Sequence, residues 1–153
     1  MASAWRIVLP ARAADAFSGE GARRFGGRWN SPGAAVVYAS EHASHAALEI
    51  LVHFQPITPR ARFAAFRLDF PDTLITRIPA AELPAGWRGS PPGPDTMQLG
   101  DAWLRAGRSA VLAVPSAIIP VETNFLLNPA HPDFRRIRIA KPEPFTFDPR
   151  LLR

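Results

Sequence analysis

The chain has 153 residues, a net charge of +5, 17 prolines and no cysteine. The absence of cysteine excludes disulfides, thiolate catalysis and zinc sites built on cysteine. Hydrophobic residues make up 47 % and charged residues 20 % of the chain, which is a globular composition and not a disordered one. We therefore expect residues 1–153 to form one domain, since single domains most often have roughly 100–150 residues.

The basic side chains are nearly all arginines, because Lys141 is the only lysine among 18 basic residues. A GC-rich coding sequence is the simpler explanation for most of them. A basic surface also suits a phosphate-bearing ligand, a nucleic acid or an acidic partner. Met1–Pro10 has no signal-peptide core, and no run approaches the roughly 20 apolar residues of a membrane span. We expect a cytoplasmic protein without membrane contact.

The first third of the chain predicts two strands and a helix. The strands are Trp5–Leu9 and the short apolar run Val36–Ala39. Between them, Ser18–Gly33 is rich in glycine, which allows close backbone approach to a ligand. Ser40 is the candidate N-cap of a helix that ends near Phe54. Its predicted buried face consists of Ala43, Ala47, Ile50, Leu51 and Phe54.

The rest of the chain predicts several strands and one more helix. Asp95 or Thr96 is the candidate cap of that helix, and Gly107 closes it. The order of elements predicts an α+β domain with a compact, mostly antiparallel sheet and few helices. The expected elements are a half-buried strand through Phe66–Phe70, a weaker strand at Leu74–Ile78, a Pro/Gly surface loop at Leu83–Asp95, a helix at Met97–Arg105, a central strand at Ala110–Val114 and a one-faced strand at Arg136–Ile139.

Gly26–Asn30 contains Arg28 between two glycines and a tryptophan. An arginine beside an aromatic ring and an amide could bind a phosphate and a flat ring. A tight turn with a surface arginine is the simpler interpretation of the residues alone. The segment matches neither a P-loop nor a dinucleotide-binding Rossmann motif.

His45, Glu49 and His53 are spaced four residues apart and form one stripe on the predicted helix. Three interpretations remain open. The stripe could bind a divalent metal, although a solvated helix face is commoner. Alternatively, Glu49 alone faces a cleft and acts as a carboxylate.

Tyr38 is the only tyrosine, at the end of a predicted strand. Its ring could stack on a ligand with a free hydroxyl, or simply pack in the core. Ser116 follows the central strand, without the Gly-x-Ser-x-Gly motif of hydrolases. Asn124 and His131 lie in a segment with turn-forming Asn-Pro and His-Pro steps, where polar groups have structural roles by default.

Many short segments, in order, resemble the RES-domain family, which is named after an arginine, a glutamate and a serine. In this chain these residues are Arg28, Glu49 and Ser116, and the family's tyrosine is Tyr38. The resemblance covers nearly the whole chain, but assigns nothing to the variable 83–95 loop. The matching segments are Trp5-Arg6-Ile7, Phe17-Ser18-Gly19-Glu20-Gly21-Ala22, Gly27-Arg28-Trp29-Asn30, Val36-Val37-Tyr38-Ala39-Ser40, Leu48-Glu49-Ile50-Leu51-Val52-His53, Leu99-Gly100-Asp101, Val114-Pro115-Ser116, Asn124-Phe125-Leu126-Leu127-Asn128-Pro129 and His131-Pro132-Asp133-Phe134.

The resemblance implies a bacterial toxin of a type II toxin–antitoxin pair with an ADP-ribosyltransferase-like fold. RES proteins cleave the nicotinamide–ribose bond of NAD+, and the ADP-ribose passes to water, phosphate or a protein. The implied partner is an antitoxin with an Xre-type helix-turn-helix that covers the active site. It also provides the only DNA contact. A homodimer within the complex and no metal are expected as well.

The resemblance also implies roles for individual residues. Glu49 would stabilise the ribosyl cation, and Arg28 would hold the pyrophosphate. Tyr38 would stack on or orient the nicotinamide end, and Ser116 would hydrogen-bond within the site. Arg6 is a weaker candidate for a second phosphate contact. The alternative function is a non-enzymatic module that binds nucleic acid or protein through its arginines, which a steep salt dependence of DNA binding would reveal.

Overall fold

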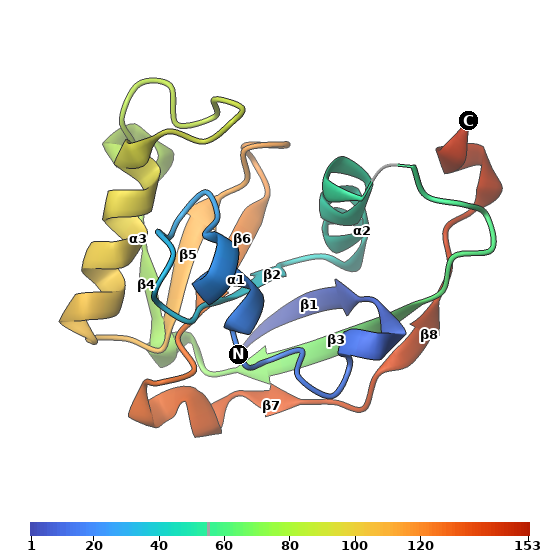
Figure 1. The fold of residues 1–153 in the computed structure, drawn as a ribbon. Coiled ribbons are helices and arrows are strands. Elements are labelled where there is room, and N and C mark those ends of the chain that lie inside the picture. Colours follow the sequence, from blue (N-terminus) through green and yellow to red (C-terminus); the bar gives the residue numbers. More distant parts are fainter. Residues whose placement is uncertain (55) are drawn as a thin grey trace.

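The computed structural model describes residues 1–54 and 56–153 (Figure 1). These residues form one sheet with helices packed against it, which confirms the α+β class. No helix among them has the length and apolar character needed to cross a bilayer. In chain order the strands and helices are β1 (Ala2–Val8), α1 (Glu20–Phe25), β2 (Val37–Ser40), α2 (Ala43–His53), β3 (Phe63–Phe70), β4 (Ile75–Arg77), α3 (Pro94–Ala106), β5 (Val111–Pro115), β6 (Thr123–Leu127), β7 (Arg138–Ile139) and β8 (Glu143–Phe145).

The sheet has the strand order β4-β5-β6-β2-β1-β3-β7, and β8 pairs with the first residues of β3. Strands β4 and β5 are parallel, whereas the other paired strands of the described chain are antiparallel. The register between β1 and β2 contains the single pair Trp5–Ser40. The sheet therefore consists of two halves joined at this pair, with α3 beside β4 and β5 and with α2 over β1 (Figure 1).

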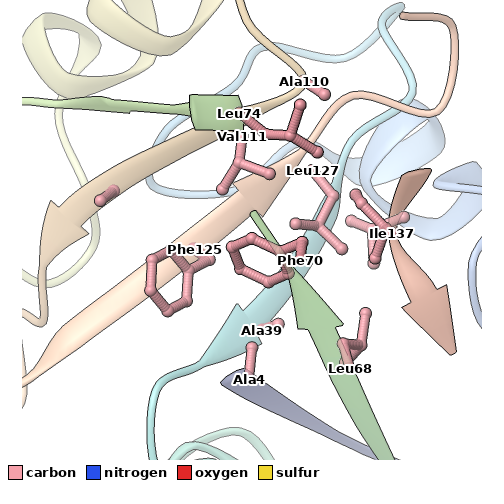
Figure 2. Close-up of a cluster of buried hydrophobic side chains, with 12 residues drawn as sticks. Ala4, Ala39, Leu68, Phe70, Leu74, Ala110, Val111, Phe125, Leu127 and Ile137 are labelled. Atoms are coloured by element: carbon pink, nitrogen blue, oxygen red, sulfur yellow. The ribbon is translucent and has the colours of Figure 1, made fainter. Parts of the chain in front are cut away.

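Strands β5 and β6 are buried on both faces, because successive side chains point to opposite sides of a sheet. One set packs against Leu68 and Phe70 of β3 in the core shown in Figure 2. The other set packs with Trp29 and Trp103 on the side of α3. Burial on both faces explains why these strands contain long apolar runs. The first set is Val111, Ala113, Phe125 and Leu127, and the second is Leu112, Val114 and Leu126.

The predicted helix at Ser40–Phe54 is confirmed, but its predicted cap is wrong. Ser40 is the last residue of β2, and α2 begins at Ala43 after His42. Strand pairing with β6 continues through Ser40, and its hydroxyl donates a 2.9 Å hydrogen bond to Asn124 Oδ1 across the strands. Phe54 follows the helix and is 44 % exposed, so it does not belong to the buried face.

The predicted start of α3 is also displaced, while its end is confirmed. The helix begins at Pro94 after Gly93, so Asp95 and Thr96 lie within its first turn and do not cap it. Proline suits this position because its missing N–H would have no helical partner there. Gly107 ends the helix in the left-handed conformation with φ 60°, as predicted.

One helix and two strands were not predicted, the last of them the short strand β8. Helix α1 lies in the glycine-rich segment, after a left-handed Gly19 with φ 73°. Strand β6 occupies a segment for which only turns were expected. The late strand β7 is shorter than predicted, because Pro132–Arg136 forms a 3-10 helix. The surface loop expected after Leu83 is present up to Gly93.

Candidate active site

Glu49 lies in the last two turns of α2, where Ala46 and Ile50 pack the helix onto β1 and β3. Its carboxylate is half-buried and faces the strands β2 and β6. Asn124 Nδ2 donates a 2.8 Å hydrogen bond to Glu49 Oε1, and Asn124 Oδ1 accepts from Ser40. Ser40 and Asn124 are directly paired in the sheet. The chain Ser40–Asn124–Glu49 therefore ties the carboxylate to rigid strands, so Glu49 is more than a solvated helix residue.

The two histidines of the stripe contact opposite oxygens of this carboxylate. Buried His45 has Nε2 3.3 Å from Glu49 Oε1, and exposed His53 has Nε2 3.5 Å from Glu49 Oε2. Burial opposes ionisation of Glu49, but hydrogen bonding with His53 and Asn124 outweighs it and holds the pKa of Glu49 below its usual value. Glu49 is therefore a carboxylate at neutral pH. Hydrogen bonding with Glu49 raises the pKa of His53.

Arg28 stands at the tip of a tight turn that is closed by a bridge between Gly27 and Asn30. Its Nη1 donates 2.8 Å hydrogen bonds to the carbonyls of Trp87 and Gly89. Burial lowers the pKa of Arg28, while Glu49 and Tyr38 are close enough to oppose this shift. The guanidinium remains charged at neutral pH. Arg28 therefore lies close enough to Tyr38 and Glu49 to interact with both electrostatically.

Tyr38 supports the turn that carries Arg28. Its hydroxyl donates a 2.6 Å hydrogen bond to Asn30 Oδ1 and accepts one of 3.1 Å from the Trp29 N–H. Burial raises the pKa of Tyr38, so the phenol stays neutral. The sequence analysis allowed a free hydroxyl at Tyr38, but in the structure both hydrogen bonds occupy it. A Cβ at Gly27 would lie 2.7 Å from this oxygen, which explains a glycine before Arg28.

Helix α3 supports the same turn from the other side. A Cβ at Gly100 would overlap the carbonyl of Trp29, so only glycine lets the helix approach this closely. Asp101 accepts a 2.9 Å hydrogen bond from the Ser31 N–H. The family segment Leu99-Gly100-Asp101 is thus explained by its contact with the turn that carries Arg28.

Arg6 and Ser116 make structural contacts in this structure. Arg6 donates hydrogen bonds of 2.8 Å to the carbonyls of Ala16 and Tyr38, and burial lowers its pKa to about 10. Fully buried Ser116 accepts hydrogen bonds of 3.1 and 3.2 Å from the backbone N–H groups of Ile118 and Ile119. Their roles in ligand binding stay predictions.

The described residues contain no group of three or more His, Asp or Glu side chains placed to hold a metal ion. A pocket of about 210 Å³ lies at the ends of β4 and β5, lined in part by Arg77, Pro115 and Glu122. It includes neither Arg28 nor Glu49. The two charged residues of the candidate site therefore lie outside this pocket.

A sequence profile of the RES domain matches residues 3–148. The chain belongs to the RES-domain family. A protein named "Prs ADP-ribosylating toxin" from Sphingobium sp. (strain YBL2) is 41 % identical, over 99 % of this chain and 97 % of its own. Proteins named "Toxin Res" are 38 % identical in Yersinia enterocolitica and 40 % identical in Pseudomonas putida, each over 96 % of this chain and 97 % of its own. The family resemblance is thereby confirmed.

Sequence reasoning missed three parts of this RES-domain site. Asn124 was assigned a structural role by default, although it holds Glu49. His53 was considered only with a metal or with solvent. The 83–93 loop was left without a role, although its carbonyls bind Arg28. The only sequence signal for Asn124 was its place in a family segment, because its partner Glu49 is 75 positions away.

Proposed function

We propose that this RES-domain protein is a toxin that cleaves the nicotinamide–ribose bond of NAD+. The observation that carries the proposal is the ionised carboxylate of Glu49, held by Asn124 and close to Arg28. Nicotinamide in NAD+ is already a cationic leaving group, so its expulsion needs no strong acid. The barrier lies in forming an oxocarbenium-like ribose, which a fixed carboxylate stabilises.

The remaining residues would bind and orient the substrate. Arg28 would grip the pyrophosphate, because a guanidinium offers two parallel donors to phosphate oxygens. Tyr38 would orient the nicotinamide end with its ring, since its hydroxyl is engaged with Asn30. Ser116 would hydrogen-bond within the site through its O–H donor, since its oxygen already accepts from the backbone. Arg6 would make a second phosphate contact through Nη2, since Nε and Nη1 donate to backbone carbonyls.

For the acceptor of ADP-ribose, we favour a protein over water or phosphate. Support comes from the relative named as an ADP-ribosylating toxin, which is 41 % identical over nearly the full length of both chains. We also propose an antitoxin of the Xre helix-turn-helix type that covers the site, and a homodimer of the toxin in that complex. DNA contact would then occur through the antitoxin alone.

The arginine-patch alternative has less support. Many of the arginines form ion pairs with neighbouring carboxylates, which reduces the positive potential they could present to a nucleic acid. These pairs include Arg12–Asp15, Arg23–Glu20, Arg67–Asp69, Arg136–Asp133 and Arg150–Asp148.

The purified protein should release nicotinamide from NAD+, and cells that express it alone should lose NAD and stop growing. Products are identified with water alone, with added phosphate and with cell lysate as the source of protein acceptors. Chelator should leave the rate unchanged, since no metal is assigned. Constant NAD levels in arrested cells, together with no nicotinamide release in vitro, would contradict the proposal. Salt-sensitive DNA binding without turnover would support the alternative.

His53→Ala, which leaves no donor at this position, should move the acid limb of the pH–rate profile to higher pH. Hydrogen bonding with His53 contributes to the lowered pKa of Glu49, so its removal raises that pKa. The ionised carboxylate is the active form. Activity is therefore present above the pKa of Glu49 and is lost as the pH falls through it. The measurement is kcat/KM for nicotinamide release between about pH 3 and 8, a window that extends below the usual glutamate pKa of about 4.3.

His42→Ala is the matched control for this change. His42 pairs with Glu122 through Nδ1 at 2.7 Å, and its pKa is raised by that carboxylate and not by Glu49. Its removal should leave the acid limb in place. An unchanged acid limb in His53→Ala would show that His53 does not act on Glu49.

A further inference from the structure

The 83–93 loop connects the 3-10 helix Ala80–Glu82, which follows β4, to the N-terminal end of α3 (Figure 1). Its central residues Trp87, Arg88 and Gly89 contact two parts of the fold that are distant in sequence. One is the turn that carries Arg28, and the other is the turn after Ser116. Both turns carry residues of the family signature.

The contact with Arg28 uses one end of the guanidinium. Both hydrogen bonds, to Trp87 O and Gly89 O, come from Nη1 at 2.8 Å. A guanidinium has five N–H donors in one plane, and two of them belong to this nitrogen. Among the described residues, Nε and Nη2 have no hydrogen-bond partner. The two carbonyls therefore fix the plane of the group and leave its Nε–Nη2 edge open.

This open edge has the geometry that two phosphate oxygens require, with two parallel N–H groups. A guanidinium held in advance loses less rotational freedom when an anion binds. The loop carbonyls and a pyrophosphate would use different nitrogens of Arg28. They can therefore act together and do not compete.

The loop itself is anchored on two sides. The ring of Trp87 packs in the cluster on the side of α3 that contains Trp29 and Trp103. The side chain of Arg88 crosses to the turn after β5, where Nε donates to Ala117 O at 2.9 Å and Nη2 to Ile118 O at 3.3 Å. Because Arg88 stands between the two carbonyls that hold Arg28, loosening it would loosen both.

We infer that Trp87–Gly89 is part of the pyrophosphate-binding site, with Arg88 as a positioning residue that acts on the substrate through Arg28. This inference rests on the proposed function, because it takes NAD+ as the ligand. It gives a role to a loop to which the sequence assigned none. The structural reason for that role is the pair of backbone carbonyls, which any sequence can supply.

The test is Arg88→Ala, measured by NAD+ affinity and by the single-turnover rate of nicotinamide release. The variant loses the two hydrogen bonds from Arg88 to Ala117 O and Ile118 O, neither of which touches the substrate. Because the effect reaches NAD+ only through Arg28, affinity should fall about three- to tenfold, the equivalent of one typical hydrogen bond. The chemical step should stay near the parent rate, because Glu49 is untouched. The matched control is Arg108→Ala, which removes the same charge from an exposed residue with no hydrogen bond or ion pair among the described residues.

A double-mutant cycle with Arg28→Ala identifies the route of the effect. If Arg88 acts through Arg28, Arg88→Ala should change NAD+ affinity little once Arg28 is removed. An equal loss in both backgrounds, or parent affinity in Arg88→Ala, would overturn the inference. If the parent protein does not bind NAD+, the proposed function fails instead. Amide exchange of the 83–93 loop then tests whether Arg88 anchors it, and unchanged exchange in Arg88→Ala would refute that anchor.

Discussion

Glu49→Gln should lower the rate of nicotinamide release about a hundredfold or more, while the protein still folds and binds NAD+. Glutamine keeps the shape of the side chain and an oxygen that can accept from Asn124. It removes the negative charge that would stabilise the ribosyl cation. Loss of one electrostatic stabiliser of a transition state typically costs about 2.7–4 kcal/mol. Single-turnover kinetics at saturating NAD+ measure the chemical step.

Two other variants serve as a control and a comparison for Glu49→Gln. Glu143→Gln removes the same charge from an exposed carboxylate in β8, outside the segments that form the candidate site, and should turn over NAD+ at the parent rate. Arg28→Ala should weaken NAD+ binding as well as turnover, because a phosphate grip acts in the ground state too. Parent-rate turnover by Glu49→Gln would refute the assigned mechanism, whatever the family membership.

Gly100→Ala should destabilise the fold and disturb the site together. The added Cβ would overlap the backbone carbonyl of Trp29. Neither atom can rotate away, because both are fixed directly by their backbones. Overpacking of this kind typically costs about 1–3 kcal/mol, and we expect the upper end because the glycine is buried. Displacement of Trp29 would also move Arg28, so NAD+ affinity should fall in the fraction that remains folded. Urea unfolding and NAD+ titration measure the two effects.

Gly21→Ala is the matched control, since it also lies in a helix. A Cβ there would meet no atom within 4 Å, and its φ is not positive. Alanine in a helix is favoured over glycine by roughly 0.5–1 kcal/mol, so this variant should be slightly more stable than the parent. Equal unfolding free energies of Gly100→Ala and the parent would show that α3 can shift without cost.

The local pattern of residues predicted much of the secondary structure. The helix at 43–53 and the end of α3 at Gly107 follow from periodicity and from the left-handed preference of glycine. The central strand β5 follows from its apolar run. The caps were wrong where tertiary contacts compete. Ser40 could have capped a helix, but pairing with β6 extends its backbone and uses its hydroxyl.

The candidate site shows the same division between local pattern and tertiary structure. The amino-acid sequence by itself determined the α+β class, the RES-domain family and the presence of Arg28, Tyr38, Glu49 and Ser116. It could not determine what those residues touch, because a hydrogen bond between distant positions leaves no periodic signal. Only the tertiary structure decided that Asn124 holds Glu49. It likewise decided that Trp87 and Gly89 hold Arg28 through carbonyls, groups that every residue carries.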